Sequence, residues 1–257
     1  MDDLAEFYDD WADEYEAAHG DWEAAIRRHS ALIALALAER GVHPGDRVLD
    51  CTCGIGTQAI GLARAGYAIT GHDISARQIE FASAAARRLG VHADFAVADL
   101  LRPDTPERPL ATFDAVVTAN SLTHFHDEST LGIVLANIAA TTRPGGIVAV
   151  TNRDYDTSDR PDCTPVQRST RNGVRRVSLQ LWDWDESGDS YRMESVLLRS
   201  SVVDASPAVG WTVTTRTTEL RAWRRTQIEA AAHAAGLVEP RWHDTDWQPI
   251  FTAVRPR

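Results

Sequence analysis

The sequence predicts an α/β fold, in which helices cover both faces of a parallel sheet. Between residues 41 and 151, short apolar runs alternate with amphipathic segments of helical length. This is the pattern of parallel strands joined by crossover helices. The first apolar run leads into the stretch VLDCTCGIGTQ, residues 48–58, where two closely spaced glycines join a strand to a helix. Such a corner is typical of folds that bind nucleotides.

The composition sets limits on size and partners. A chain of 257 residues can form one α/β domain with an elaborated lid, or two small domains. Its formal charge of −11 argues against a nucleic-acid substrate. We find no apolar run of transmembrane length and no signal-peptide pattern, so we expect a cytoplasmic protein without a membrane partner. Cys51 and Cys53 have no matching Cys/His pair, so we expect no metal site.

Two classes of ligand use a glycine corner of this kind. Residues 54–59, GIGTQA, satisfy the dinucleotide fingerprint G-x-G-x-x-G/A. Asp50 argues against a dinucleotide, because a nearby acid would repel the pyrophosphate. S-adenosylmethionine has no phosphate and carries a sulfonium and an ammonium, so an acid is favourable beside it. An NAD-linked oxidoreductase and a non-catalytic adenosine-binding protein remain the alternatives.

The motifs of the core resemble those of the class I S-adenosylmethionine-dependent methyltransferases. Asp50, Gly54 and Gly56 form the D-x-x-x-G-x-G pattern of motif I, residues 113–120 with the following SLTHF resemble motif IV of the small-molecule enzymes, and residues 143–146 read RPGG. The resemblance implies a Rossmann-like, doubly wound sheet of seven strands that ends in an antiparallel hairpin. It also implies S-adenosyl-L-methionine as the cofactor and S-adenosyl-L-homocysteine as the product.

Several cofactor-binding side chains are expected at the ends of successive strands. Asp73 ends the second strand, where an acid accepts hydrogen bonds from ribose hydroxyls in methyltransferases and NAD enzymes alike. Asp99 and Leu100 resemble the motif that binds the adenine amino group and covers the ring. The sequence DISARQI after the second strand resembles the methyltransferase D-x-S-x-x-M-L, with Gln78 in place of the usual Met. The expected cofactor set is Tyr15, Arg28, Asp50, Gly54, Gly56, Asp73, Ile74, Gln78, Asp99, Leu100 and Asn120.

Residues 1–40 are expected to form a helical lid. Aromatic and apolar residues recur there at helical spacing, namely Leu4, Phe7, Tyr8, Trp11 and Tyr15. Aromatic faces attract a sulfonium, and we assign Tyr15 to the cofactor and Trp11 to the acceptor. The sequence resembles the glycine N-methyltransferase group, in which an Arg on the equivalent helix binds the carboxylate of the cofactor. That resemblance implies this role for Arg28, and a solvent-facing Arg is an equally weighted alternative.

The stretch 152–222 is expected to bind the methyl acceptor. TNRDYD, residues 151–156, resembles the R-N-Y-D of glycine and sarcosine N-methyltransferases, in which the Arg holds the acceptor's carboxylate. Arg153 stands in that place, and an ion pair with a nearby acid is equally compatible. Strand-like runs predict an antiparallel sheet over 174–184, 190–200 and 210–221, and 157–172 is predicted as a loop. The expected acceptor set is Trp11, Leu122, Arg153, Tyr155, Trp182 and Trp247.

His124 and Tyr155 are the candidate catalytic residues. His124 follows the fourth strand, at the sheet edge where open α/β folds bind ligands. It could take a proton from an oxygen or carbon acceptor, and a structural loop histidine is the alternative. An amine acceptor needs only to arrive deprotonated. The sequence therefore predicts a methyltransferase that acts on an amino acid or amine, or on an aromatic natural product, including C-methylation of an indole.

We expect one domain over residues 1–257. Its parts are a helical lid (1–40), a cofactor-binding core (41–151), an inserted substrate-binding β region (152–222) and a closing helix with a β-hairpin (223–257). The acceptor's identity is not fixed by the sequence, and a homo-oligomer is left open.

Overall fold

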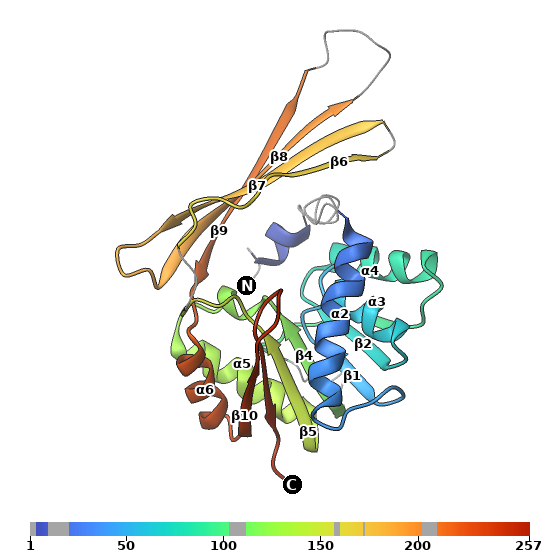
Figure 1. Cartoon of the computed structure of the whole chain (residues 1–257), viewed down its shortest axis with the longest axis vertical. Helices are drawn as coiled ribbons and strands as arrows, with labels where there is room; N and C mark the ends of the chain where they lie inside the picture. Colours follow the sequence, from blue (N-terminus) through green and yellow to red (C-terminus); the bar gives the residue numbers. More distant parts are fainter. Residues whose placement is uncertain (1–3, 10–20, 103–111, 157–159, 172, 202–209) are drawn as a thin grey trace.

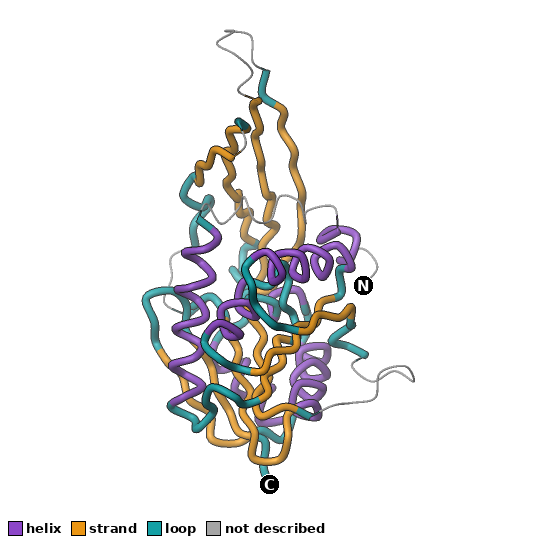
Figure 2. Tube along the Cα trace, turned by 90° about the vertical axis from the view of Figure 1, so that its right-hand side faces the viewer, coloured by secondary structure: helices purple, strands orange, loops and turns teal. Residues whose placement is uncertain are grey.

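The computed structural model describes residues 4–9, 21–102, 112–156, 160–171, 173–201 and 210–257. These residues form a seven-stranded mixed sheet with helices on both faces and a separate four-stranded antiparallel sheet (Figures 1 and 2). The α-helices are α2 (Trp22–Ala38), α3 (Thr57–Arg64), α4 (Ala76–Arg88), α5 (Glu128–Thr141) and α6 (Arg225–Ala234). The strands of the larger sheet are β1 (Arg47–Asp50), β2 (Ala68–Asp73), β3 (Asp94–Val97), β4 (Phe113–Ala119), β5 (Thr142–Thr151), β10 (Val238–His243) and β11 (Ile250–Val254).

The larger sheet has the order β10-β11-β5-β4-β1-β2-β3. Its strands β1 to β5 pair in parallel, and β11 runs antiparallel to both β5 and β10. This confirms the predicted doubly wound sheet and its closing hairpin. The chain order reverses between β1 and β4, and the carboxyl ends of the strands at such a switch point form the ligand crevice of open α/β sheets.

Alternating side chains along β4 belong to two different cores. Ala115 and Val117 pack in the cluster that contains residues of α2 and α3, whereas Val116 packs in the cluster that contains residues of α5 and α6. Because successive side chains of a strand point to opposite faces, these helix pairs cover opposite faces of the sheet. Both faces of β4 are therefore buried, as expected of a parallel strand.

The second sheet comprises β6 (Gln167–Arg171), β7 (Val174–Trp184), β8 (Ser190–Ser201) and β9 (Thr212–Arg221) in sequence order. It stands at one end of the seven-stranded body, with the helical residues 4–9 between them (Figure 1). The prediction of an antiparallel sheet is confirmed, but β6 lies in a stretch predicted as a loop. Strand β6 has the sequence QRSTR, which lacks the alternation of apolar and polar residues that predicts a strand. It lies at the edge of the sheet, where polar side chains are usual.

Asp99 and Leu100 were expected at the end of a strand, but β3 ends at Val97, so that both residues lie in the loop that follows it. Strand β5 begins at Thr142 and includes the RPGG segment. Gly145 there has a φ of +73° and donates its N–H to the carbonyl of Arg255 at 2.8 Å. The segment therefore continues the sheet through a hydrogen bond to the chain end.

The close packing of α2 on α3 depends on the absence of a side chain at Gly61. A Cβ at this position would lie 2.3 Å from Ser30 Oγ and 2.7 Å from the carbonyl oxygen of Ile26. We expect Gly61→Ala to lower the free energy of unfolding by roughly 1–3 kcal/mol, as overpacking usually does. Urea denaturation measures this change.

Gly132 of α5 provides the matched control, because nothing lies within 4 Å of a Cβ placed there. Gly132→Ala should raise the free energy of unfolding by about 0.5–1 kcal/mol through helix propensity. If both variants were equally stable, the close approach of α2 to α3 would be wrong.

Candidate active site

The glycine corner lies between β1 and α3. Gly54 and Gly56 have φ values of +53° and +86°, a region that non-glycine residues adopt rarely. A Cβ on Gly56 would also lie 3.2 Å from the Cβ of Ala82, so space as well as conformation requires glycine. Gly56 caps α3 at its N-terminus, and the turn brings backbone N–H groups to the edge of a cavity that Gly54 and Thr57 line.

Asp73 connects the end of β2 to this corner. Its Oδ2 accepts a hydrogen bond from Gly54 N–H at 2.8 Å, and its Oδ1 accepts one from Ser75 N–H at 3.0 Å. Burial raises the pKa of the Asp73 carboxyl, and the backbone N–H donors oppose that rise. The side chain lines the cavity. A carboxylate held from behind by two N–H groups is well placed to accept hydrogen bonds from hydroxyls in front of it.

Asp50 lies beneath the corner and not in the cavity. Its side chain is fully buried, and it is not among the residues that line the cavity. Burial raises the pKa of its carboxyl to about 7, and a hydrogen bond from the Thr52 backbone opposes that rise. The structure therefore places Asp50 behind the turn and not in the lining of the cavity, where the sequence analysis expected it.

A further part of the cavity wall comes from the loop after β3 and from the segment that leads from β2 into α4. Asp99, Leu100, Ile74 and Gln78 all line it. Asp99 Oδ1 accepts from Leu101 N–H at 2.8 Å, which leaves Oδ2 for another donor. Gln78 is buried, and its Oε1 has no hydrogen-bond partner in the described part of the chain. The wall therefore offers acceptor oxygens to a ligand that carries N–H groups.

Residues 4–9 form a roof over this cavity. Leu4 and Tyr8 line it, and Asp9 accepts hydrogen bonds from Ser75 Oγ and from Arg77 N–H at the start of α4. Tyr8 is a site residue that the aromatic spacing placed on the lid helix but did not assign to the site. Trp11 and Tyr15, which were assigned, lie outside the described residues.

Arg28 is not brought into the cavity. Its guanidinium is half exposed, donates to the carbonyl of Asp246 at 2.7 Å and lies 3.2 Å from the Asp246 carboxylate. The neighbouring His29 lines the cavity instead, and its ring stacks on Trp247 at 3.9 Å. The proposed contact of Arg28 with the cofactor's carboxylate would require this ion pair to open.

A second cavity of about 510 Å³ lies between the body and the four-stranded sheet, a volume in the range of small-molecule sites. Tyr8, Asn120 and His124 line both cavities. The second cavity is also lined by four predicted acceptor residues, namely Arg153, Tyr155 and Trp247 from the body and Trp182 from β7. The two cavities therefore meet at three side chains, one from the roof and two from the segment after β4.

Leu122 is a correction to the expected acceptor set. Its side chain is fully buried and belongs to the core cluster beside α5, and it lines neither cavity. Its carbonyl accepts a hydrogen bond from Trp223 Nε1 at 3.0 Å. Leu122 therefore anchors the short helical turn that presents His124 two residues later.

His124 is neutral at physiological pH. Burial lowers the pKa of its imidazole to about 4, and its Nε2 shares a hydrogen bond of 2.7 Å with the Tyr8 hydroxyl. A neutral imidazole can accept a proton, and the tyrosine fixes its orientation. Asn120 precedes it with a φ of +57°, an uncommon backbone conformation for a residue other than glycine.

Tyr155 is poorly suited to act as a base. Burial raises the pKa of its hydroxyl, which shares a hydrogen bond of 2.8 Å with the Tyr191 hydroxyl. Tyr191 stacks on Trp182 at 4.9 Å, and the Arg153 guanidinium lies 4.0 Å from the Trp182 ring centroid. Tyr191 was not predicted, although the alternation along β8 places it on the same face as Met193, another lining residue. The group forms a wall of aromatic rings carrying one cation.

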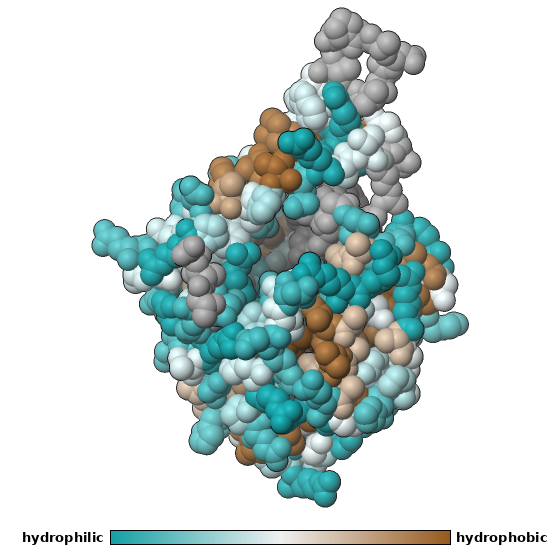
Figure 3. Space-filling model, viewed as in Figure 1, coloured by the Kyte–Doolittle hydropathy of each residue, from teal (hydrophilic) through white to brown (hydrophobic). Residues whose placement is uncertain are grey.

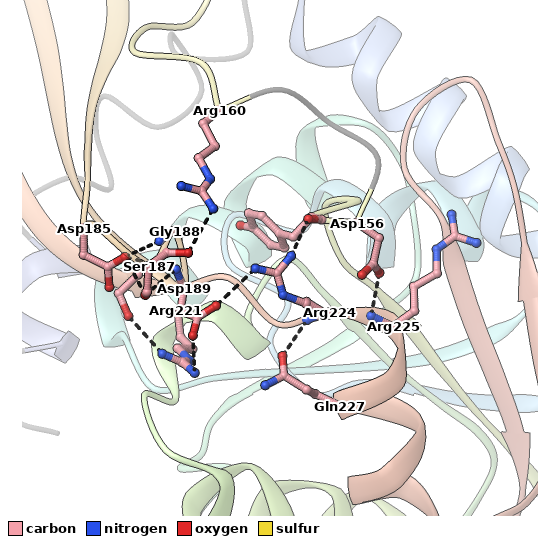
Figure 4. A network of polar contacts seen from close by, with 12 residues as sticks. Asp156, Arg160, Asp185, Ser187, Gly188, Asp189, Arg221, Arg224, Arg225 and Gln227 are labelled. Atoms are coloured by element: carbon pink, nitrogen blue, oxygen red, sulfur yellow. Dashed lines mark hydrogen bonds and ion pairs between the residues drawn. The ribbon is translucent and has the colours of Figure 1, made fainter.

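A polar network holds this wall against the body (Figure 4). Arg224 donates to the carbonyl of Tyr155 and to the Asp189 carboxylate, both at 3.1 Å. The backbone N–H of Arg225 donates to Asp156 at 2.9 Å. The start of α6 is thereby joined both to the loop after β5 and to the β7–β8 hairpin, so the position of Arg153 follows from these contacts.

Within the described residues, no group of three His, Cys, Asp or Glu side chains could hold a metal ion. None of the helices described is long and apolar enough to cross a membrane.

Comparison with known proteins identifies the core. A family model described as "Methyltransferase domain" matches residues 48–146. Glycine N-methyltransferase of Rattus norvegicus is 30% identical over 156 residues, which cover 57% of this chain and 52% of that protein. The 27-O-demethylrifamycin SV methyltransferase of Amycolatopsis mediterranei is 34% identical over 141 residues, or 51% and 49% of the two chains. The chain thus spans about half the length of these curated relatives.

Solved structures resemble the chain over most of its length. The amino pentose methyltransferase CalS10 of Micromonospora echinaspora has a TM-score of 0.72 and 18% identity, with 90% of this chain and 91% of that chain covered. The sugar N-methyltransferase KedS8 of a Streptoalloteichus species has a TM-score of 0.68 and 23% identity, with 100% and 93% covered. At these identities the likeness establishes the fold.

The lowered pKa of the partly buried His124 imidazole predicts a pH dependence of stability. The unfolded chain binds a proton at His124 near pH 6.5, whereas the folded chain binds it only near pH 4. Stability from this group is therefore complete above pH 6.5 and is lost as the pH falls from 6.5 to 4, by about 3 kcal/mol in all.

Urea denaturation between pH 7 and 4.5 checks this expectation. The free energy of unfolding should fall less steeply with pH in His124→Gln than in the wild type, and the exposed His92→Gln should follow the wild type. Identical slopes for all three proteins would contradict the burial of His124.

Proposed function

Because residues 48–146 match a methyltransferase domain and the chain has a class I fold, we propose that this protein transfers the methyl group of S-adenosylmethionine to a small molecule. The observation that carries the proposal is the junction of the two cavities at Tyr8, Asn120 and His124. One cavity offers the acceptor groups that an adenosine needs. The other is large enough for a small molecule and opens onto the same three side chains.

The residues of the first cavity fit the proposed cofactor. Asp73 would hold the ribose hydroxyls, and Asp99 with the unpartnered Oε1 of Gln78 would accept from the adenine amino group. Gly54 lines the same cavity with a φ of +53°, a backbone conformation that residues with a side chain rarely adopt. When bound, the cofactor supplies an activated methyl group on a positively charged sulfur. A neutral His124 and the Tyr8 ring beside it introduce no positive charge that would repel that sulfonium.

The chain's own contribution to transfer is alignment and the exclusion of water. Leu4 and Tyr8 of the segment 4–9 line the first cavity, and residues of the four-stranded sheet line the second. Among the described residues, those that line the second cavity include no Asp or Glu. No carboxylate among them would hold an ammonium in its protonated form, and the Arg153 cation disfavours it further. We infer that an amine acceptor binds there as the neutral nucleophile.

An amine that also carries an anionic or strongly polar group is the acceptor we favour. Two buried groups that line the second cavity, Trp182 Nε1 and Gln248 Oε1, have no hydrogen-bond partner among the described residues. Arg153 supplies a cation for a carboxylate or a similar anion. The relatives include glycine and sugar N-methyltransferases, which agrees with a nitrogen acceptor.

Methylation of an aromatic ring, including indole C-methylation, is the second candidate. The aromatic wall around Trp182 and Tyr191 favours a flat ligand, and a carbon acceptor would use His124 as the base. The pH dependence of the methyl-transfer rate separates the two candidates. For an amine acceptor, the rate should rise as the amine itself loses its proton. For a carbon acceptor, it should follow the titration of a group on the protein.

Isothermal titration calorimetry tests the cofactor. S-adenosylhomocysteine should bind, and NAD and NADP should not. Asp73→Asn should weaken S-adenosylhomocysteine at least tenfold, because it loses the charge-assisted hydrogen bonds to the ribose and the corner. Asp94→Asn, an exposed position on β3, is the control. Binding of a nicotinamide nucleotide instead would redirect the assignment to hydride transfer.

Arg153→Gln tests the acceptor site. Methyl transfer from labelled S-adenosylmethionine to a panel of amino acids, amino sugars and indoles would first identify an acceptor. For an anionic acceptor, KM should rise roughly tenfold to a hundredfold in Arg153→Gln, in line with one lost charge-assisted contact of about 1.5–3 kcal/mol. Arg160→Gln is the matched control, because Arg160 also lies over a tryptophan but is absent from the cavity lining. An unchanged KM would remove Arg153 from this role.

A further inference from the structure

The four-stranded sheet has one face toward the acceptor cavity and one face away from it. Trp182 on β7 and Met193 on β8 lie opposite each other and line that cavity, as does Ser195 two residues further along β8. Side chains alternate along a strand, and directly paired residues share a face. These residues therefore define the inner face of the sheet, and the alternate residues form the outer face.

The charged residues of the sheet are divided between the two faces. The inner face carries Arg176, Arg199 and Arg216, and no Asp or Glu stands at an inner-face position among the described residues of the four strands. The acidic residues of these strands all lie on the outer face, namely Asp183, Glu194 and Glu219. In a chain with 26 basic and 37 acidic residues, a face that carries cations alone reverses the overall charge locally.

The outer face carries charges of both signs. Arg192 on β8 lies 2.8 Å from the Asp183 carboxylate on β7, and the register places the two residues directly opposite each other. Leu181 and Val213 are exposed apolar residues of the same face, and Figure 3 shows hydrophilic residues around a hydrophobic area over this sheet. The segregation of cations is therefore a property of the inner face alone.

The cations of the inner face are not arranged to stabilise the sheet. Arg176 and Arg199 lie directly opposite each other on β7 and β8, and like charges at opposed positions of an antiparallel pair are destabilising. The third cation, Arg216, pairs in register with Ser195, at the margin of the acceptor cavity. An anion bound on this face would offset the repulsion among the three side chains.

We propose that the inner face beyond Ser178 and Ser195 binds a phosphoryl group of the methyl acceptor, and that Arg176, Arg199 and Arg216 hold it. The inference rests on the proposed function, because it extends the acceptor cavity assigned there. Ser178 lines that cavity, and Arg176 is the next inner-face residue along β7, about 7 Å away. The anion site therefore begins where the lining of the cavity ends.

Arg153 does not serve the same group of the acceptor. Its guanidinium lies 4.0 Å from the ring centroid of Trp182, and Trp182 is six residues from Arg176 along β7, about 20 Å in an extended strand. The acceptor is thus an elongated molecule, with its nitrogen at the junction of the two cavities and its phosphoryl end on the inner face. Ser178 and Gln180 lie between these ends and can form hydrogen bonds with a polar middle section.

The number of cations favours a phosphoryl group over a carboxylate. A carboxylate carries a single charge on two oxygens, whereas a phosphate ester carries about −1.5 to −2 charges at pH 7 and three acceptor oxygens. A guanidinium has several N–H donors, so each arginine can bind one of these oxygens and keep another contact. A phosphate monoester and a diphosphate share this chemistry, and the choice of probe distinguishes them.

Isothermal titration calorimetry of the full chain, saturated with S-adenosylhomocysteine, tests the proposal with inorganic pyrophosphate and inorganic phosphate as probes. Sodium chloride keeps the ionic strength constant. Pyrophosphate should bind, and Arg176→Gln and Arg216→Gln should each weaken it at least tenfold, because each removes a charge-assisted contact. Arg175→Gln is the matched control, since Arg175 is the adjacent residue of β7 on the outer face. Tighter binding of phosphate than of pyrophosphate would indicate a monoester, and the reverse order a diphosphate.

Urea denaturation separates ligand binding from a structural role of the same side chain. Without a probe, Arg176→Gln should be at least as stable as the wild type, because it removes one of two opposed like charges. Saturating pyrophosphate should raise the denaturation midpoint of the wild type and of Arg175→Gln, and it should leave that of Arg176→Gln unchanged.

Three results would overturn the inference. The first is binding of S-adenosylhomocysteine without binding of pyrophosphate, which would leave the proposed function in place. The second is an equal pyrophosphate affinity in Arg175→Gln and in either inner-face variant. The third is a loss of stability in Arg176→Gln without the probe. A chain that binds pyrophosphate through Arg176 but does not bind S-adenosylhomocysteine would contradict the proposed function and not the anion site.

Discussion

The hydrogen bond from Gly54 N–H to the Asp73 carboxylate joins the two features on which the candidate site depends. It connects the end of β2 to the glycine corner after β1, at the edge where the sheet order reverses. A buried carboxylate without such donors would be costly. With them, it presents its outer lone pairs to a ligand while keeping the corner open. The floor of the nucleoside cavity follows from this contact and from the left-handed glycines beside it.

The second cavity depends on the attachment of the four-stranded sheet to the core. The four-stranded sheet is separate from the seven-stranded one. Hydrogen bonds from Arg224 and Arg225, at the start of α6, connect the β7–β8 hairpin and the loop after β5 to the core (Figure 4). Transfer chemistry of the proposed kind needs two ligands aligned within a shared, dry space. The first cavity lies in the core, and the second lies between the core and the four-stranded sheet. Tyr8, Asn120 and His124 separate the two cavities.

The sequence predicted the core well because its signals are local. A strand ending in Asp73, the glycine spacing and the closing hairpin each depend on a few consecutive residues. It could not place Arg28, because the pairing with Asp246 joins residues 218 positions apart in the chain. Asp50 was placed in the ligand cavity from its charge, whereas burial puts it below the turn with a pKa near 7. Leu122 was assigned to the acceptor because it follows the fourth strand at the ligand-binding edge of the sheet, but the 3₁₀ turn directs its side chain into the core.

A crystal structure of the chain with S-adenosylhomocysteine would show whether the first cavity holds the cofactor. We expect ribose hydroxyls on Asp73, adenine between Asp99 and Gln78, and the sulfur facing Tyr8, Asn120 and His124, which separate the two cavities. The second cavity should remain open on the far side of these three side chains. A ligand whose adenine occupies the second cavity, or whose ribose does not contact Asp73, would contradict the assignment of both cavities.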